Sequence, residues 1–233
     1  MSPRTDHPTH WQPDMPIFAN RVEAGRQLGE ELRLRGYGEV PTVVVAIPRG
    51  GVPVGHAVAR AVGATLEIII PRRLTVPDEP QLTFGAITPD GTMVLDLPLV
   101  ESRRLTTLDI KRVAMETLAE VRRQRRAYRG QDTPLELIGK TVILVDDGLS
   151  SGFTMLAAVR AIHRHQPSRI VVAVPVSSLG SLDRLLTQVN ELVCLVERDN
   201  ENFAVAHCYR DFSDLTDDQV RAFLTDPNLD GQP

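Results

Sequence analysis

Residues 141–154 read Thr-Val-Ile-Leu-Val-Asp-Asp-Gly-Leu-Ser-Ser-Gly-Phe-Thr, and this stretch decides the fold. Its first five residues are apolar or β-branched, which is typical of a strand buried on both faces of a parallel sheet. Two aspartates and a loop of small residues follow, and an apolar helical pattern then runs from Phe153 to Ile162. Ligands of open α/β sheets bind just beyond the carboxyl ends of such strands. We therefore expect a binding site at Asp146 and in the loop after it.

The chemistry of this loop predicts two kinds of ligand group. From Ser150 to Thr154 the chain offers hydroxyls and backbone N–H groups at a helix N-terminus, and this arrangement favours a bound phosphate. The carboxylates of Asp146 and Asp147 would repel that phosphate, so they suit vicinal hydroxyls, a magnesium ion, or both. A diol and a phosphate within a few ångströms of each other describe a ribose 5-phosphate.

A second segment, Ile47-Pro48-Arg49-Gly50-Gly51, repeats this arrangement after an earlier apolar run. The glycines allow close backbone approach, and the helical pattern from Val52 begins with unpaired N–H groups. Arg49 adds a positive charge that can bind phosphate through two parallel hydrogen bonds. An Arg-Gly-Gly turn alone is as often an ordinary turn with a solvated arginine, so the two segments matter as a pair. Neither G-x-G-x-x-G nor G-x-x-x-x-G-K-[ST] occurs, which disfavours a dinucleotide fold and a P-loop.

Apolar strand patterns alternate with helical patterns along most of the chain. The strand patterns cover 43–47, 66–70, 141–145, 169–176 and 191–196, and the helical patterns cover 21–34, 52–62, 153–162 and about 182–189. This alternation predicts an α/β fold with a doubly wound, mostly parallel sheet. Prolines and glycines interrupt residues 72–92, where we expect only short strand pieces at 84–87 and then at 93–95. A long basic helix is expected from about Glu101 to Tyr128.

Composition sets the remaining expectations. The chain has 233 residues, 42% hydrophobic and 24% charged, and no Pro/Gly/Ser linker, so we expect a mobile N-terminal arm (1–16) and a single domain (17–233). A net charge of −4 gives no indication of nucleic-acid binding, and no run of about 18 apolar residues indicates a membrane span. The N-terminus lacks the apolar core of a signal peptide, so a cytoplasmic location is expected. Cys194 and Cys208 lack metal-ligand spacing and are expected to be reduced thiols.

Together the two segments resemble the type I phosphoribosyltransferases. That family has an apolar strand, two acidic residues, a short spacer and Thr-Gly-x-Thr or a close variant, and an Arg-Gly-Gly or Lys-Gly-Gly loop after an early strand. Three more segments look like a bacterial phosphoribosyltransferase group: Arg72-Arg73-Leu74, Gln81-Leu82-Thr83-Phe84-Gly85-Ala86-Ile87 and Tyr209-Arg210-Asp211-Phe212-Ser213. The resemblance runs from about Phe18 to Val220, nearly the whole chain.

The resemblance implies a role for each matching residue. Asp146 and Asp147 would hold the ribose 2′- and 3′-hydroxyls, and would hold Mg²⁺ indirectly through ribose or water. Together with these two aspartates, the positions expected to act in catalysis are Arg49, Arg72 and Arg73, with either Arg72 or Arg73 reaching the pyrophosphate. The expected substrate-binding positions are Gly50, Gly51, Gly148, Leu149, Ser150, Ser151, Gly152, Phe153 and Thr154. Phe153 stands where a small residue is common, so its ring must point away from the phosphate.

The resemblance also implies how the fold surrounds the site. A flexible β flap at about 74–83 would close over the reacting centre, and a small hood would come from the chain ends, around 202–212 and 11–20. Some members have a non-proline cis peptide in the Arg-Gly-Gly loop. The expected assembly is a homodimer.

The implied function is transfer of ribose 5-phosphate from 5-phosphoribosyl 1-pyrophosphate (PRPP) to an unidentified, nucleobase-like acceptor, with release of pyrophosphate. Members that use 6-oxopurines carry an aspartate where Ser150 stands, which argues against such an acceptor. Two alternatives stay open. One is a non-catalytic ribose-phosphate sensor on the same fold. The other is a serine hydrolase, because residues 148–152 also spell G-x-S-x-G, with Ser150 as nucleophile and Asp183 or Asp199 with His207 completing a triad.

Overall fold

The centre of the protein is a five-stranded parallel sheet. The computed structural model describes residues 16–129, 135–198, 203–226 and 229. In spatial order the strands are β2 (Thr65–Ile68), β1 (Thr42–Ala46), β6 (Thr141–Val145), β7 (Arg169–Ser178) and β8 (Glu191–Arg198). Every neighbouring pair is parallel. The expected α/β fold with a mostly parallel sheet is confirmed.

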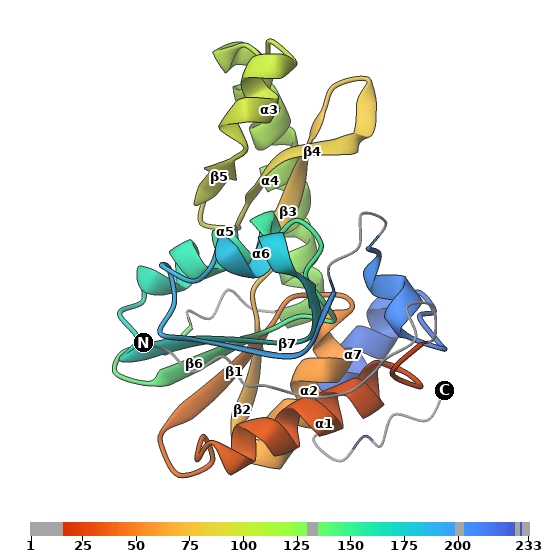
Figure 1. Ribbon diagram of the computed structural model, residues 1–233. Helices are drawn as coiled ribbons and strands as arrows, with labels where there is room; N and C mark the ends of the chain where they lie inside the picture. Colours follow the sequence, from red (N-terminus) through yellow and green to blue (C-terminus); the bar gives the residue numbers. More distant parts are fainter. Residues whose placement is uncertain (1–15, 130–134, 199–202, 227–228, 230–233) are drawn as a thin grey trace.

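Helices cover both faces of this sheet (Figure 1). Two lie against one face, α1 (Arg21–Leu34) and α2 (Gly51–Val62), and two against the other, α5 (Phe153–His163) and α6 (Leu179–Asp183). Successive strand side chains point to opposite faces, so Ile143 packs towards α1 and α2 whereas Leu144 packs towards α5. This explains why these strands are apolar at every position.

A second, antiparallel sheet projects from the body of the molecule, at the top of Figure 1. It contains β3 (Arg72–Val76), β4 (Glu79–Ile87) and β5 (Met93–Leu95). We expected a loop before Phe84, but β4 begins at Glu79 and pairs with β3 around a tight turn in which Asp78 has φ +67°. The prolines of this region made it look irregular, although Leu74, Val76 and Phe84 are buried together. The expected flap is therefore a hairpin, with shifts in register on either side of Thr75.

The helix expected from Glu101 to Tyr128 is two helices, α3 (Leu97–Ser102) and α4 (Thr107–Arg129). Arg104 interrupts it with φ +52°, and the side chains of Thr106 and Asp109 then cap α4 by bonding to each other's backbone N–H groups. The prediction of a helix at about 182–189 is also wrong, because the helix in this region, α6, begins at Leu179 and ends at Asp183.

One helix was not expected from the sequence. This is α7 (Asp217–Thr225), which begins at a capping box formed by Thr216 and Gln219. The Thr-x-x-Gln pattern is a known signature of a helix start and would have located it.

Residues 17–19, near the start of the described chain, meet residues 203–213 beside the sheet. These two segments form the expected hood. Phe18 pairs with Tyr209 in a parallel bridge next to the short helix η1 (Val205–Cys208). The Tyr209 ring centroid lies 5.6 Å from that of Phe18 and 5.2 Å from that of Phe212. The predicted arm at 1–16 lies almost entirely outside the described residues, as do 199–202.

Both cysteines are free thiols, as expected. Burial raises the pKa of the Cys194 thiol to about 12, so this thiol stays protonated at neutral pH. Among the described residues, no helix is long and apolar enough to cross a membrane.

Candidate functional site

Neighbouring strands bring the two predicted segments to one edge of the sheet. β1 and β6 run in parallel, and their last residues, Ala46 and Val145, are register partners. The Ile47 N–H donates to the Val145 carbonyl at 2.9 Å, so the chain leaves both strands at the same level. The Arg49 loop and Asp146 therefore begin side by side at the carboxyl edge, where ligands of such sheets bind.

Gly50 and Gly51 permit direct contact between the two segments. A Cβ atom on Gly50 would lie 1.9 Å from Asp147 Oδ2, and one on Gly51 would lie 2.9 Å from the Asp146 Cα. Both distances are shorter than a real Cβ atom tolerates. Only glycine lets the aspartate segment approach so closely.

The Asp147 carboxylate is held by an arginine that the sequence did not single out. Arg21 Nε lies 2.8 Å from Asp147 Oδ2, and the two side chains are only 11% and 15% exposed. The same guanidinium lies 3.7 Å from the centroid of the Phe212 ring and donates to the Ser213 carbonyl at 2.9 Å. Tyr209 donates its hydroxyl to the Asp147 carbonyl at 2.6 Å. Thus α1 and the hood both contact the ribose-binding candidate.

Burial raises the pKa values of both aspartates. For Asp146 the pKa is raised well above the usual 3.8, first by burial and then by the negative charge of Asp147. Burial also raises the pKa of Asp147, although Arg21 opposes the shift. The pair therefore carries its two negative charges at a cost, which a cation or hydroxyl groups would reduce.

Because the pKa of Asp146 is raised, the difference in folding stability between Asp146→Asn and the wild type should depend on pH. A carboxyl whose folded pKa is raised retains its proton longer in the folded state, so folding stability falls as pH rises from about 4 through the raised pKa. The asparagine side chain has no proton to lose, so the stability of the variant should not fall over this range. Relative to the wild type, its free energy of unfolding should increase by about 1.4 kcal/mol for each pH unit by which the folded-state pKa of Asp146 is raised. Urea unfolding at a series of pH values measures the difference. A constant difference across that range would contradict the raised pKa.

Neighbouring elements hold the loop after the aspartates. Leu149 is buried and joins β7 through a parallel bridge to Ser177. The Ser150 carbonyl accepts hydrogen bonds from the hydroxyls of Ser178, at 3.0 Å, and Ser181. Gly148 lies against β7 and η1, with no space for a Cβ atom. The loop is therefore fixed by the carboxyl end of β7, by α6 and by η1.

The start of α5 has the features of an anion site. Gly152 adopts φ +76° as the N-cap residue, and no side chain caps the helix. Its first N–H groups thus lack a capping acceptor from a side chain, and Ser151 and Thr154 lie next to them. The Phe153 ring is buried in the core, with the Arg184 guanidinium 4.5 Å from its centroid. The ring therefore packs in the core beside the C-cap residue of α6.

Arg49 points towards α4 and α7. The Pro48–Arg49 peptide is cis, as in some members of the family that the two segments resemble. Arg49 Nε donates to the Tyr128 hydroxyl at 3.3 Å and lies 3.2 Å from Asp217 Oδ1, and its NH1 donates to the Leu215 carbonyl at 3.1 Å.

Arg72 and Arg73 lie on opposite faces of β3. Arg72 NH2 donates to Gln124 Oε1 at 2.8 Å, and its Nε is buried without a hydrogen-bond partner in the described part of the chain. Arg73 is exposed. Of these two residues, Arg72 is the one connected to Arg49, through the side chains of Gln124 and Tyr128.

Comparison with known proteins shows the family of this chain. Residues 17–211 match the family model of the phosphoribosyl transferase domain. The chain belongs to the phosphoribosyl transferase family. It is 36% identical over 210 residues to proteins from two strains of Mycobacterium tuberculosis that are each named as a proposed phosphoribosyl transferase. The match covers 90% of this chain and 47% of those proteins, so the chain spans about half the length of these curated relatives.

The phosphoribosyl transferase domain is also similar to a solved structure. TT1426 from Thermus thermophilus is 34% identical, with a TM-score of 0.72, and the match covers 89% of this chain and 97% of that chain. The fold is therefore shared with this relative over almost its full length.

Five residues that contact the candidate site were not predicted: Arg21, Gln124, Tyr128, Tyr209 and Asp217. They lie on α1, α4, the hood and α7, far in sequence from both loops. Tyr209 belongs to a segment that matches the family, which gave some signal. The other four are ordinary helix residues in the sequence, and only the packing of the helices brings them to the site.

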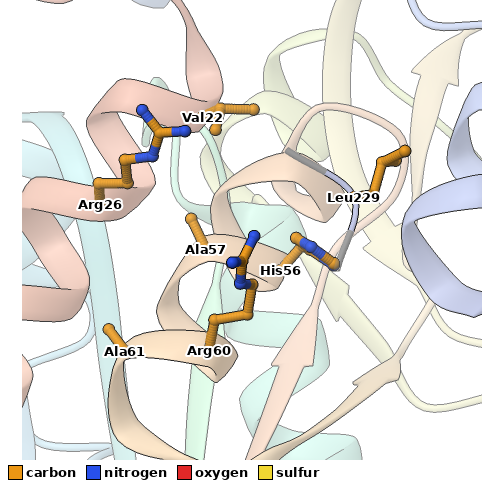
Figure 2. Close-up of a pocket in the computed structure, with 7 residues that line it drawn as sticks. All are labelled: Val22, Arg26, His56, Ala57, Arg60, Ala61 and Leu229. Carbon is orange, nitrogen blue, oxygen red and sulfur yellow. The ribbon is translucent and has the colours of Figure 1, made fainter. Parts of the chain in front are cut away.

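A cavity of about 260 Å³ lies elsewhere on this phosphoribosyl transferase domain, between α1, α2 and the C-terminal segment (Figure 2). Its lining residues are Val22, Arg26, His56, Ala57, Arg60, Ala61 and Leu229. His56 Nδ1 bonds to the Phe223 carbonyl at 2.9 Å and so joins α2 to α7. None of the predicted site residues lines this cavity.

Proposed function

We propose that this domain transfers the ribose 5-phosphate group of PRPP to a small, nucleobase-like acceptor and releases pyrophosphate. The contact between Gly50 and Asp147 carries the proposal. It puts a candidate pyrophosphate loop directly beside a carboxylate pair that suits a ribose diol, with a helix N-terminus next to the pair. PRPP has these three groups in this order.

Each group of the donor would meet matching chemistry. Asp146 and the oxygen of Asp147 not bonded to Arg21 would accept hydrogen bonds from the ribose hydroxyls. The first turn of α5, with Ser151 and Thr154, would bind the 5-phosphate. The backbone N–H group of Gly50 would bind the pyrophosphate, whereas the Gly51 N–H already donates to the Ile47 carbonyl at 3.0 Å.

The bond between ribose C1 and the pyrophosphate oxygen breaks with positive charge building on the sugar and negative charge on the leaving group. Arg49 and Arg72 would stabilise the negative charge, and this electrostatic effect is commonly the largest part of catalysis. The aspartates would fix the ribose so that C1 faces the acceptor.

Mg²⁺ fits this site as a partner of the donor. The described residues include no group of three or more acidic, histidine or cysteine side chains able to hold a metal directly. Asp146 and Asp147 would therefore hold the ion through water or ribose oxygens, and the ion would neutralise the pyrophosphate.

We also propose a homodimer. Leu108 and Met115 lie seven residues apart on one side of α4 and are 77% and 73% exposed. Side chains of this kind on a projecting helix suit burial against a second copy. Sedimentation of Leu108→Lys compared with the wild type tests this.

Ligand-dependent melting tests the function. With Mg²⁺ and PRPP at about 100 times the dissociation constant, the domain should be stabilised by about 2.7 kcal/mol, and a screen of bases should then show pyrophosphate release. No stabilisation would contradict PRPP binding altogether. Stabilisation without turnover on any base would instead favour the ribose-phosphate sensor.

A variant and a covalent label of Ser150 distinguish the hydrolase alternative from a phosphoribosyl transferase. Among the described residues, no histidine bonds to the Ser150 hydroxyl, and Asp199 lies outside them. A Ser150→Ala variant should retain PRPP-dependent stabilisation, because Ser150 is held through its backbone carbonyl. Labelling of wild-type Ser150 by a fluorophosphonate would revive the hydrolase.

A further inference from the structure

Two side chains of α4 connect Arg49 to Arg72. Arg72 NH2 donates to Gln124 Oε1 at 2.8 Å, and Gln124 Nε2 donates to the Tyr128 hydroxyl at 2.9 Å. Arg49 Nε donates to the same hydroxyl at 3.3 Å. Gln124 and Tyr128 are one helical turn apart, so both face the same side of α4. The Tyr128 hydroxyl thus connects the two arginines, directly to Arg49 and through Gln124 to Arg72.

The direction of every hydrogen bond in this network is fixed. A tyrosine hydroxyl has a single proton, and here its oxygen already accepts from Gln124 and Arg49. The proton therefore goes to Asp217 Oδ1, at 2.6 Å. Burial, and then the bond to Asp217, raises the pKa of Tyr128, so the hydroxyl remains a donor at neutral pH.

The network contains two guanidinium groups, and both of the carboxylates near it act on Arg49. Asp217 Oδ1 lies 3.2 Å from Arg49 Nε, and the negative charge of Asp214 also acts on Arg49. The Arg49 and Asp217 side chains are 47% and 45% exposed, so the pair is open to exchange with a ligand. The buried Arg72 Nε still lacks an acceptor within the described part of the chain. A buried guanidinium N–H group without an acceptor, beside a half-exposed ion pair, indicates an anionic ligand.

We infer that Gln124 and Tyr128 are positioning residues that direct Arg72 and Arg49 at the pyrophosphate of the donor, and that Asp217 pairs with Arg49 until pyrophosphate displaces it. The inference rests on the proposed function, because the proposed donor supplies the pyrophosphate. It assigns opposite effects to two neighbours of Arg49. Tyr128 supports the bound state, and Asp217 competes with it.

Calorimetric titration of the full chain with magnesium pyrophosphate tests these opposite effects. Tyr128→Phe should weaken binding about tenfold, because one hydrogen bond to a charged group is lost from the network. Asp217→Asn should tighten binding about threefold, because a partly exposed competing carboxylate is removed. The phenylalanine ring retains the packing of Tyr128 against Val121 and Phe223.

Tyr37→Phe is the matched control. Tyr37 is also buried and donates its hydroxyl to a carboxylate, that of Glu191, at the opposite edge of the sheet. This variant should leave pyrophosphate affinity unchanged. A purely structural role for the network would lower the melting temperatures of both test variants and would not tighten binding in Asp217→Asn.

The outcomes separate this inference from the proposed function. If the wild type binds pyrophosphate and PRPP but Asp217→Asn binds pyrophosphate no more tightly, the inference is overturned and the function stands. Unchanged affinity in Tyr128→Phe overturns it equally. If the wild type binds neither ligand, both the inference and the proposed function fail.

Discussion

Asp147→Asn should lose the stabilisation that Mg²⁺ and PRPP give the wild type. The wild type should gain about 2.7 kcal/mol at about 100 times the dissociation constant, and the variant should gain almost nothing under the same conditions. The amide lacks the negative charge and one of the two acceptor oxygens that a ribose diol needs. Melting with and without ligand measures both gains.

The variant must be compared with its own ligand-free state. Asp147→Asn leaves the buried Arg21 without a negative partner, and breaking such a pair costs about 3–5 kcal/mol of folding stability. Asp218→Asn is the control, because Asp218 is exposed and its ion pair is with Arg221 of the same helix. If Asp147→Asn is stabilised by PRPP as much as the control is, Asp147 does not bind the ribose.

Gly50→Ala should weaken PRPP binding by about a hundredfold while the domain still folds. The new Cβ atom would lie 1.9 Å from Asp147 Oδ2, so either the carboxylate or the loop must move by more than an ångström. Loss of one or two hydrogen bonds to charged groups of the ligand corresponds to about this factor in affinity. Titration with PRPP measures the change, and circular dichroism checks the fold.

Gly180→Ala is the matched control for Gly50→Ala. A Cβ atom on Gly180 meets nothing within 4 Å, so the same added methyl group should leave PRPP affinity unchanged. Equal losses in the two variants would mean that the loss does not arise from the contact between Gly50 and Asp147.

The sequence predicts the central sheet well because its signal is local. Buried parallel strands are apolar at every position, and the run ending at Asp146 shows this directly. The projecting part was harder to predict. The break at Arg104 depends on one residue with positive φ, and the hairpin from Arg72 to Ile87 is stabilised by packing on α3 and α4 despite its prolines.

The candidate site likewise has a part that the sequence predicts and a part that it does not. Its two loops could be found from the sequence because each loop carries its chemistry within a few residues. Arg21 is 126 positions from Asp147, and Tyr128 is 79 positions from Arg49, so no local pattern links either pair. The sequence also left open whether Arg72 or Arg73 would reach the pyrophosphate on the side of the Arg49 loop. The alternation of side chains along β3 puts Arg72 on that side.

The Arg21 guanidinium has a consequence for the hood. It contacts the Asp147 carboxylate, the Phe212 ring and the Ser213 carbonyl at once. Any ligand that changes the first contact therefore changes the free energy of the other two. Thermodynamic reciprocity then makes the order of the chain ends and the occupancy of the ribose site one coupled equilibrium. Amide hydrogen exchange at 209–213 would report ligand binding without a probe in the site itself.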